Sequence, residues 1–180
     1  MALNNSISHT ILKRLLPLVA LLLIPTGCRI SYKLNGSALD YTVYKSIAIG
    51  NFPIRAALVY PPLQQTFENA LLDYVQRNTR LQTTDNTGAA DLQMEGEITN
   101  YSLSPQAVGA DAYASQTRLT ISVRVRYTDN RDDSKDIDQT FSAYRDFPAS
   151  EMLTDVQDQL CTKISDELVE LIFNSTLGNW

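Results

Sequence analysis

The chain has 180 residues, of which 44% are hydrophobic and 19% charged, which is ordinary globular composition. Its formal net charge of −5 gives no basic patch, so no nucleic-acid partner is expected. Its one histidine, His9, lies in a segment interpreted below as a cleaved leader. Without it the Ser/His/Asp and Cys/His mechanisms and imidazole-based zinc sites are excluded, so we do not expect an enzyme.

Residues 1–27 have the pattern of a secretory signal peptide. Lys13 and Arg14 precede an apolar run over residues 15–24, and small residues follow it. This run is too short to span a bilayer core of about 30 Å as a helix. We therefore expect export through the Sec pathway.

The end of this leader, Gly27-Cys28, resembles the lipobox of bacterial lipoproteins, although Pro25 stands where that pattern usually has leucine. The resemblance implies cleavage before Cys28 and a diacylglyceryl and N-acyl lipid on its sulfur and amino groups. Such an anchor holds a protein on a membrane surface. Cys161 then has no intramolecular thiol partner and, lying in a helical pattern, is interpreted as a small buried core residue.

After the leader, residues 28–44 show no clear period and are expected to form a lipidated tether and lead-in, followed by one domain over residues 45–180. A short buried strand is predicted over residues 46–52, ended by Pro53. A helix is predicted to begin at Pro61 and Pro62 and to end near Asn78, because apolar residues then recur at helical spacing.

Alternating polar and apolar residues next predict strands over residues 92–99 and 117–127. A polar turn follows, and residues 137–144 are expected to fold back as a hairpin strand. A register that pairs Val123 with Phe141 also places Arg126 beside Asp138.

A long amphipathic helix closes the chain, with its apolar stripe over residues 153–171 and its end at Gly178. Two helices with one apolar stripe each and a sheet with one apolar face predict a two-layer α/β sandwich. We expect a mostly antiparallel four-stranded sheet with both helices packed on one face.

Three arginines, Arg118, Arg124 and Arg126, project to the polar side of one predicted strand, while Glu95 and Glu97 project from the polar side of another. One interpretation is cross-strand charge pairing on a solvated face. The other is a row of guanidinium groups that binds phosphates bidentately. The three arginines are therefore our candidates for anion binding.

No metal or cofactor site is predicted. The acidic segment from Asp129 to Asp133 has Arg131 where a calcium loop needs an oxygen ligand, and strands flank it, so a hairpin turn is favoured. No glycine-rich nucleotide-binding motif occurs.

Taken in order, several motifs resemble the LptE family of lipopolysaccharide-assembly lipoproteins, in its Bacteroidetes-type branch. The resemblance covers most of the chain after Cys28 and is carried by Asn51-Phe52-Pro53, Arg55-Ala56-Ala57-Leu58-Val59, Pro62-Leu63, Thr66-Phe67-Glu68-Asn69-Ala70-Leu71, Leu92-Gln93-Met94-Glu95-Gly96-Glu97-Ile98, Tyr101, Ser104-Pro105, Arg118-Leu119-Thr120-Ile121, Val123, Val125 and Asn179-Trp180.

The resemblance implies an outer-membrane lipoprotein that sits in the lumen of the large β-barrel LptD. It would support assembly of that barrel, act as a plug and bind lipopolysaccharide for delivery to the cell surface. Arg29, the residue after Cys28, is not the aspartate that signals inner-membrane retention in enteric bacteria. The alternative is a periplasm-facing lipoprotein that binds a soluble ligand and has no barrel partner.

Overall fold

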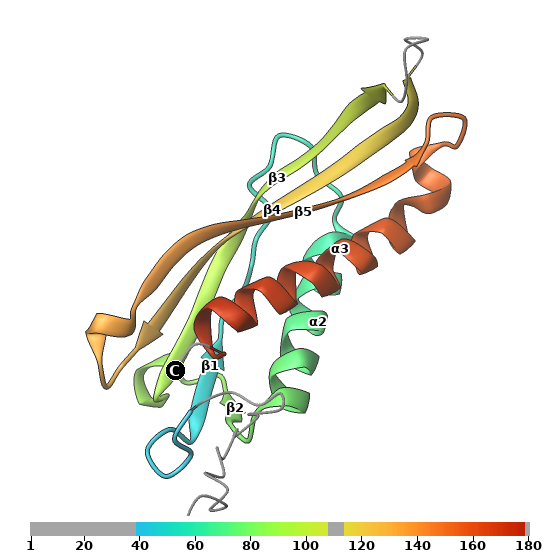
Figure 1. The fold of residues 1–180 in the computed structure, drawn as a ribbon. Helices are drawn as coiled ribbons and strands as arrows, with labels where there is room; N and C mark the ends of the chain where they lie inside the picture. Colours follow the sequence, from blue (N-terminus) through green and yellow to red (C-terminus); the bar gives the residue numbers. More distant parts are fainter. Residues whose placement is uncertain (1–38, 108–113, 179–180) are drawn as a thin grey trace, which may run out of the picture. The chain divides into compact units, whose positions relative to one another are not determined.

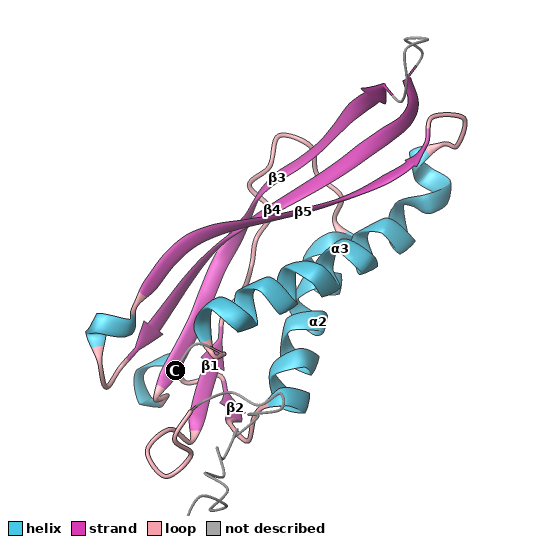
Figure 2. Ribbon diagram, viewed as in Figure 1, coloured by secondary structure: helices cyan, strands magenta, loops and turns pink. Residues whose placement is uncertain are grey.

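The computed structural model describes residues 39–107 and 114–178, in which two α-helices pack on a twisted sheet (Figures 1 and 2). Cys28, the tether before residue 39 and Asn179-Trp180 lie outside the described residues. The elements in chain order are β1 (Ser46–Ile49), α2 (Pro62–Asn78), β2 (Gln82–Thr84), β3 (Leu92–Ala107), β4 (Ala114–Asp129), β5 (Ile137–Pro148) and α3 (Leu153–Thr176), with single 3₁₀ turns at Thr87–Ala89 and Asp133–Lys135.

The predicted hairpin register is confirmed. Strands β4 and β5 are antiparallel, with Val123 opposite Phe141 and Arg126 opposite Asp138. Strand β3 is antiparallel to β4 and parallel to β1. The α/β sandwich expected from the sequence is therefore present, with both helices on one face of the sheet (Figure 1).

The expected four strands are corrected to five, in the order β2-β1-β3-β4-β5. The additional strand, β2, is parallel to β1 and contains only Gln82, Thr83 and Thr84. These side chains are polar and mostly exposed, so the strand has none of the apolar alternation that marks a half-buried strand. A short polar edge strand of this kind also limits edge-to-edge association.

Strand β3 runs eight residues beyond its predicted end at residue 99. The sequence pattern missed this continuation because a β-bulge between Ile98 and Asn100 shifts the alternation of side chains between the two faces. Before the bulge Ile98 faces the helices, and after it Tyr101 does. An extra residue in one strand moves every later side chain to the other face. The alternation read from the sequence therefore breaks at Thr99 although the strand continues.

The core lies between the helices and the sheet. Helix α2 begins with proline at its first position, as predicted, and Phe67 on its buried side packs edge-on against Phe52, with ring centroids 5.1 Å apart. Cys161 on α3 is buried, as predicted, and burial raises its pKa to about 11. The largest fully buried side chains are Tyr127, Phe52, Phe67, Ile47, Leu63, Leu71, Leu92, Met94, Ile98, Leu119, Ile121 and Ile164.

Two aspartates fasten the strand ends at one end of the sheet. Asp91 accepts hydrogen bonds from the backbone N–H groups of Lys45 and Ser46, at 2.8 and 3.1 Å, and from Nε of Arg131 at 2.8 Å. The fully buried Asp129 accepts a hydrogen bond from the Tyr44 hydroxyl group at 2.8 Å and caps the turn that follows it. The acidic segment that suggested a calcium loop is thus a hairpin turn held by its own carboxylates.

Candidate functional site

One face of the sheet is left uncovered by α2 and α3, and its side chains are polar. Because side chains alternate along a strand, β4 directs its apolar residues to the helices and its arginines to this uncovered side, here called the open face. Strands β3 and β5 add glutamates and aspartates to the same side. The three arginines singled out from the sequence are therefore brought together on one surface.

At one end of the open face, Arg118 forms a bidentate pair with Asp146. Its Nε and Nη2 donate to the two carboxylate oxygens at 2.7 and 2.9 Å. The guanidinium carbon also lies 3.7 Å from the ring centroid of Tyr144, a cation–π contact. This pair lowers the pKa of Asp146, and it is the least exposed of the open-face pairs, at 30% and 26% for the two side chains.

Further along β4, Arg124 and Arg126 share the carboxylate of Asp138. Arg124 donates Nε and Nη2 to its two oxygens, both at 2.8 Å, which lowers the pKa of Asp138. Arg126 lies 4.0 Å from the same carboxylate and donates Nη1 to Glu95 at 3.1 Å. Arg126 is more exposed than the other two arginines and has only this single hydrogen bond among the described residues.

Carboxylates on the neighbouring strands neutralise the positive charge of the three arginines. Glu95, Glu97, Asp138 and Asp146 supply one more charge than the three arginines, so this set of open-face residues carries a small net negative charge. Each guanidinium already binds a carboxylate. A phosphate that approached these arginines would have to compete with those carboxylates. At Arg126 it would displace a single hydrogen bond, whereas at Arg118 or Arg124 it would displace two.

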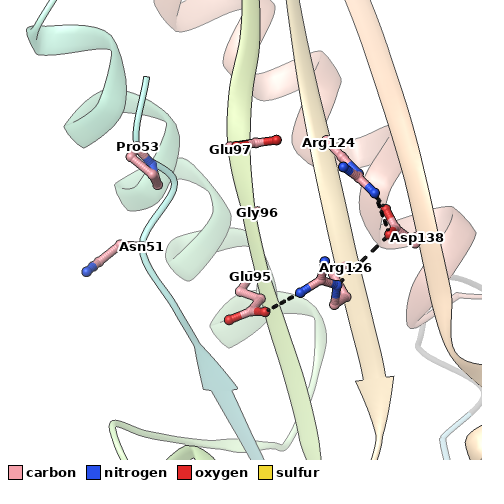
Figure 3. A pocket seen from close by; sticks show the side chains of 8 residues that line it. All are labelled: Asn51, Pro53, Glu95, Gly96, Glu97, Arg124, Arg126 and Asp138. Atoms are coloured by element: carbon pink, nitrogen blue, oxygen red, sulfur yellow. Dashed lines mark hydrogen bonds and ion pairs between the residues drawn. The ribbon is translucent and has the colours of Figure 1, made fainter. Parts of the chain in front are cut away.

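A pocket of about 310 Å³ lies on the open face around Arg124 and Arg126 (Figure 3). Glu97 points from β3 toward Arg124, and the pKa of that arginine is raised mainly by its hydrogen bonds to Asp138 and to a smaller extent by the charge of Glu97. Among the described residues no side chain forms a hydrogen bond or an ion pair with the Glu97 carboxylate. The residues that line the pocket are Asn51, Pro53, Glu95, Gly96, Glu97, Arg124, Arg126 and Asp138.

The floor of the pocket is the backbone at Gly96, where two distant segments meet. On the opposite side of this backbone, the ring of Phe52 fills the space that a side chain at position 96 would need. A Cβ at Gly96 would lie only 2.7 Å from Phe52 Cε1. The Phe52 N–H donates to Glu68 of α2 at 2.7 Å, which fixes this loop against the helix. The motif at residues 51–53 and the motif at residues 95–97 therefore build one site.

Sequence reasoning missed part of this set. Asp138 was placed beside Arg126 by the predicted register, but Asp146 lies beyond the predicted end of its strand. Asn51 and Pro53 come from the loop after β1 and reach the pocket only through tertiary packing. No local pattern in the sequence joins that loop to residues 95–97.

The chemistry available at the pocket is recognition by charge and hydrogen bonding. Within the described part of the chain, no three His, Cys, Asp or Glu side chains are arranged to hold a metal ion. Over the same residues, no helix is both long and apolar enough to span a membrane. The fold and the open face together define a two-layer α/β protein in which the helices leave one polar sheet surface uncovered.

Comparison with known proteins identifies the family within this class. The model of the LptE family, described as lipopolysaccharide-assembly, matches residues 44–176, which is more than half of the chain. The chain therefore belongs to the LptE family of lipopolysaccharide-assembly lipoproteins, a non-enzymatic family without a cofactor. No curated protein matches the sequence.

Solved structures share the fold. A hypothetical protein from Chlamydia trachomatis aligns with a TM-score of 0.53 at 13% identity, covering 76% of this chain and 99% of that one. An uncharacterized lipoprotein B from Nitrosomonas europaea aligns with a TM-score of 0.50 at 14% identity, covering 72% and 79%. At these identities the likeness supports the fold alone.

Proposed function

We propose that this chain is an outer-membrane lipoprotein subunit of the lipopolysaccharide translocon, anchored by a lipid on Cys28. In that role it supports assembly of an LptD-type β-barrel, plugs its lumen and contacts lipopolysaccharide during delivery to the surface. The family match over residues 44–176 is the observation that carries the proposal. The open face supports it, because the lumen of a large outer-membrane barrel is polar.

Co-purification tests the partner. A tag on this chain, after detergent extraction of native membranes, is expected to recover a large β-barrel protein at equal stoichiometry. An unrelated lipoprotein with the same tag and expression level is the control. Recovery of this chain alone would contradict the translocon and favour a periplasm-facing binding lipoprotein.

For lipopolysaccharide contact we propose Arg118, Arg124 and Arg126 as the binding residues. The double variant Arg118→Glu with Arg126→Glu is expected to weaken lipopolysaccharide binding at least tenfold while the circular dichroism spectrum stays native. The matched control is Arg77→Glu with Lys163→Glu, an equal charge change on α2 and α3 away from the open face. Equal binding by both double variants would leave the arginine row as cross-strand pairing only.

A further inference from the structure

The pocket over Gly96 presents hydrogen-bond donors and acceptors side by side. An arginine has five N–H donors. Arg124 uses two of them on Asp138, and Arg126 uses one on Glu95. Both arginines therefore retain donors at the pocket while they pair with Asp138 and Glu95.

The acceptors lie on the two strands that flank these donors, Glu95 and Glu97 on β3 and Asp138 on β5 (Figure 3). Glu97 has both carboxylate oxygens available with respect to the described residues, and Glu95 uses only one of its two. The register between β3 and β4 places Glu95 opposite Arg126 and Glu97 opposite Arg124. Each donor group at the pocket consequently has a carboxylate on a neighbouring strand.

This arrangement discriminates between ligand classes. A phosphate only accepts hydrogen bonds when fully ionised, and it would bring negative charge next to the carboxylates of Glu95, Glu97 and Asp138. A sugar hydroxyl donates and accepts at once and carries no charge. Adjacent hydroxyls on one ring can therefore bridge a guanidinium and a carboxylate without displacing the existing ion pairs.

We infer that the pocket over Gly96 binds the uncharged hydroxyl groups of a saccharide rather than a phosphate. Its volume of about 310 Å³ lies at the lower end of small-molecule sites and suits a short saccharide segment. The source is either the sugar part of a glycolipid or a free oligosaccharide. The choice of lipopolysaccharide as that glycolipid rests on the proposed function.

The test is a ligand-observed NMR titration of the full mature lipoprotein in detergent. The probes are the neutral N-acetylglucosamine disaccharide, followed by proton signals, and inorganic phosphate, followed by ³¹P signals. The disaccharide is expected to bind with the same affinity at about 10 and about 100 mM salt, although the Debye length falls from ~30 to ~10 Å. Phosphate is expected neither to bind at the pocket nor to displace the disaccharide.

Two variants and a matched control locate the binding. Glu97→Ala and Asp138→Asn are expected to weaken disaccharide binding about tenfold, which is the lower end of the effect of losing a hydrogen bond to a charged group. Asp146→Asn is the control, because Asp146 also holds a β4 arginine in a bidentate pair but lies outside the pocket. Its affinity is expected to equal that of the unmodified chain.

The remaining outcomes are distinguishable. Salt-sensitive phosphate binding that Arg126→Ala abolishes, absence of disaccharide binding, or an equal loss in Asp146→Asn would each overturn the inference. A further arm adds lipopolysaccharide micelles as competitor. Competition supports a glycolipid source, whereas disaccharide binding that lipopolysaccharide does not displace supports the saccharide pocket and contradicts lipopolysaccharide as its ligand.

Discussion

Replacement of Gly96 by alanine tests how the pocket floor is built. A Cβ at this position would lie 2.0 Å from the carbonyl oxygen of Arg124 and 2.7 Å from Phe52 Cε1, and real Cβ contacts essentially never fall under 3.0 Å. The nearer atom belongs to the backbone of β4, so a change of side-chain rotamer cannot relieve the clash. Strands β3 and β4 would have to move apart where they are hydrogen-bonded.

The expected cost follows from overpacking. An extra methyl group in a filled core costs about 1–3 kcal/mol, and a backbone obstruction places Gly96→Ala at ~3 kcal/mol or more. With a urea m-value of about 2 kcal/mol/M, the unfolding midpoint falls by ~1.5 M. Urea titration followed by circular dichroism measures this shift.

Gly88→Ala is the control for Gly96→Ala. Its Cβ would have no atom nearer than Asn86 Oδ1 at 3.7 Å, so the free energy of unfolding should change by no more than ~0.5 kcal/mol. A midpoint for Gly96→Ala within ~0.3 M of the unmodified chain, on the same m-value scale, would refute the packing argument. It would show that the strands can separate here at little cost.

Two further predictions concern acid stability and the lipid anchor. Burial by itself raises the pKa of Asp91, but hydrogen bonds from Lys45, Arg131 and Ser46 outweigh it and lower the pKa to about 2. The folded pKa lies below the unfolded value of 3.8, so Asp91 stabilises the fold above about pH 4 and loses about 2 kcal/mol of that stability as pH falls toward 2. Urea titrations from pH 5 to pH 2 should show a smaller loss for Asp91→Asn, and an equal loss would contradict the assignment. Cys28→Ala should release the protein from the membrane fraction or leave the leader uncut, and unchanged fractionation with normal processing would contradict lipidation at Cys28.

Local sequence patterns predicted both helices and the β4–β5 hairpin. The apolar stripes gave both helices, and matching charges and apolar residues gave the hairpin register that places Arg126 opposite Asp138. The polar strand β2 and the part of β3 beyond its bulge were missed, because neither shows the expected alternation. The pocket was missed for a different reason, since Asn51 and Pro53 reach residues 95–97 only through the tertiary packing of the loop after β1.

The two faces of the sheet contribute unequally to the stability of the fold. The helix side buries the large apolar residues, whereas the open-face ion pairs are partly exposed, and pairs of this kind typically contribute only about 0–1 kcal/mol each. Open-face variants should therefore alter binding before they alter folding. Arg118 is the exception, because its bidentate pair is less exposed and stacks on Tyr144. Charge reversal at Arg118 is therefore expected to lower the free energy of unfolding while the circular dichroism spectrum stays native. Glu97 has no hydrogen bond or ion pair among the described residues, so its replacement is expected to alter binding alone.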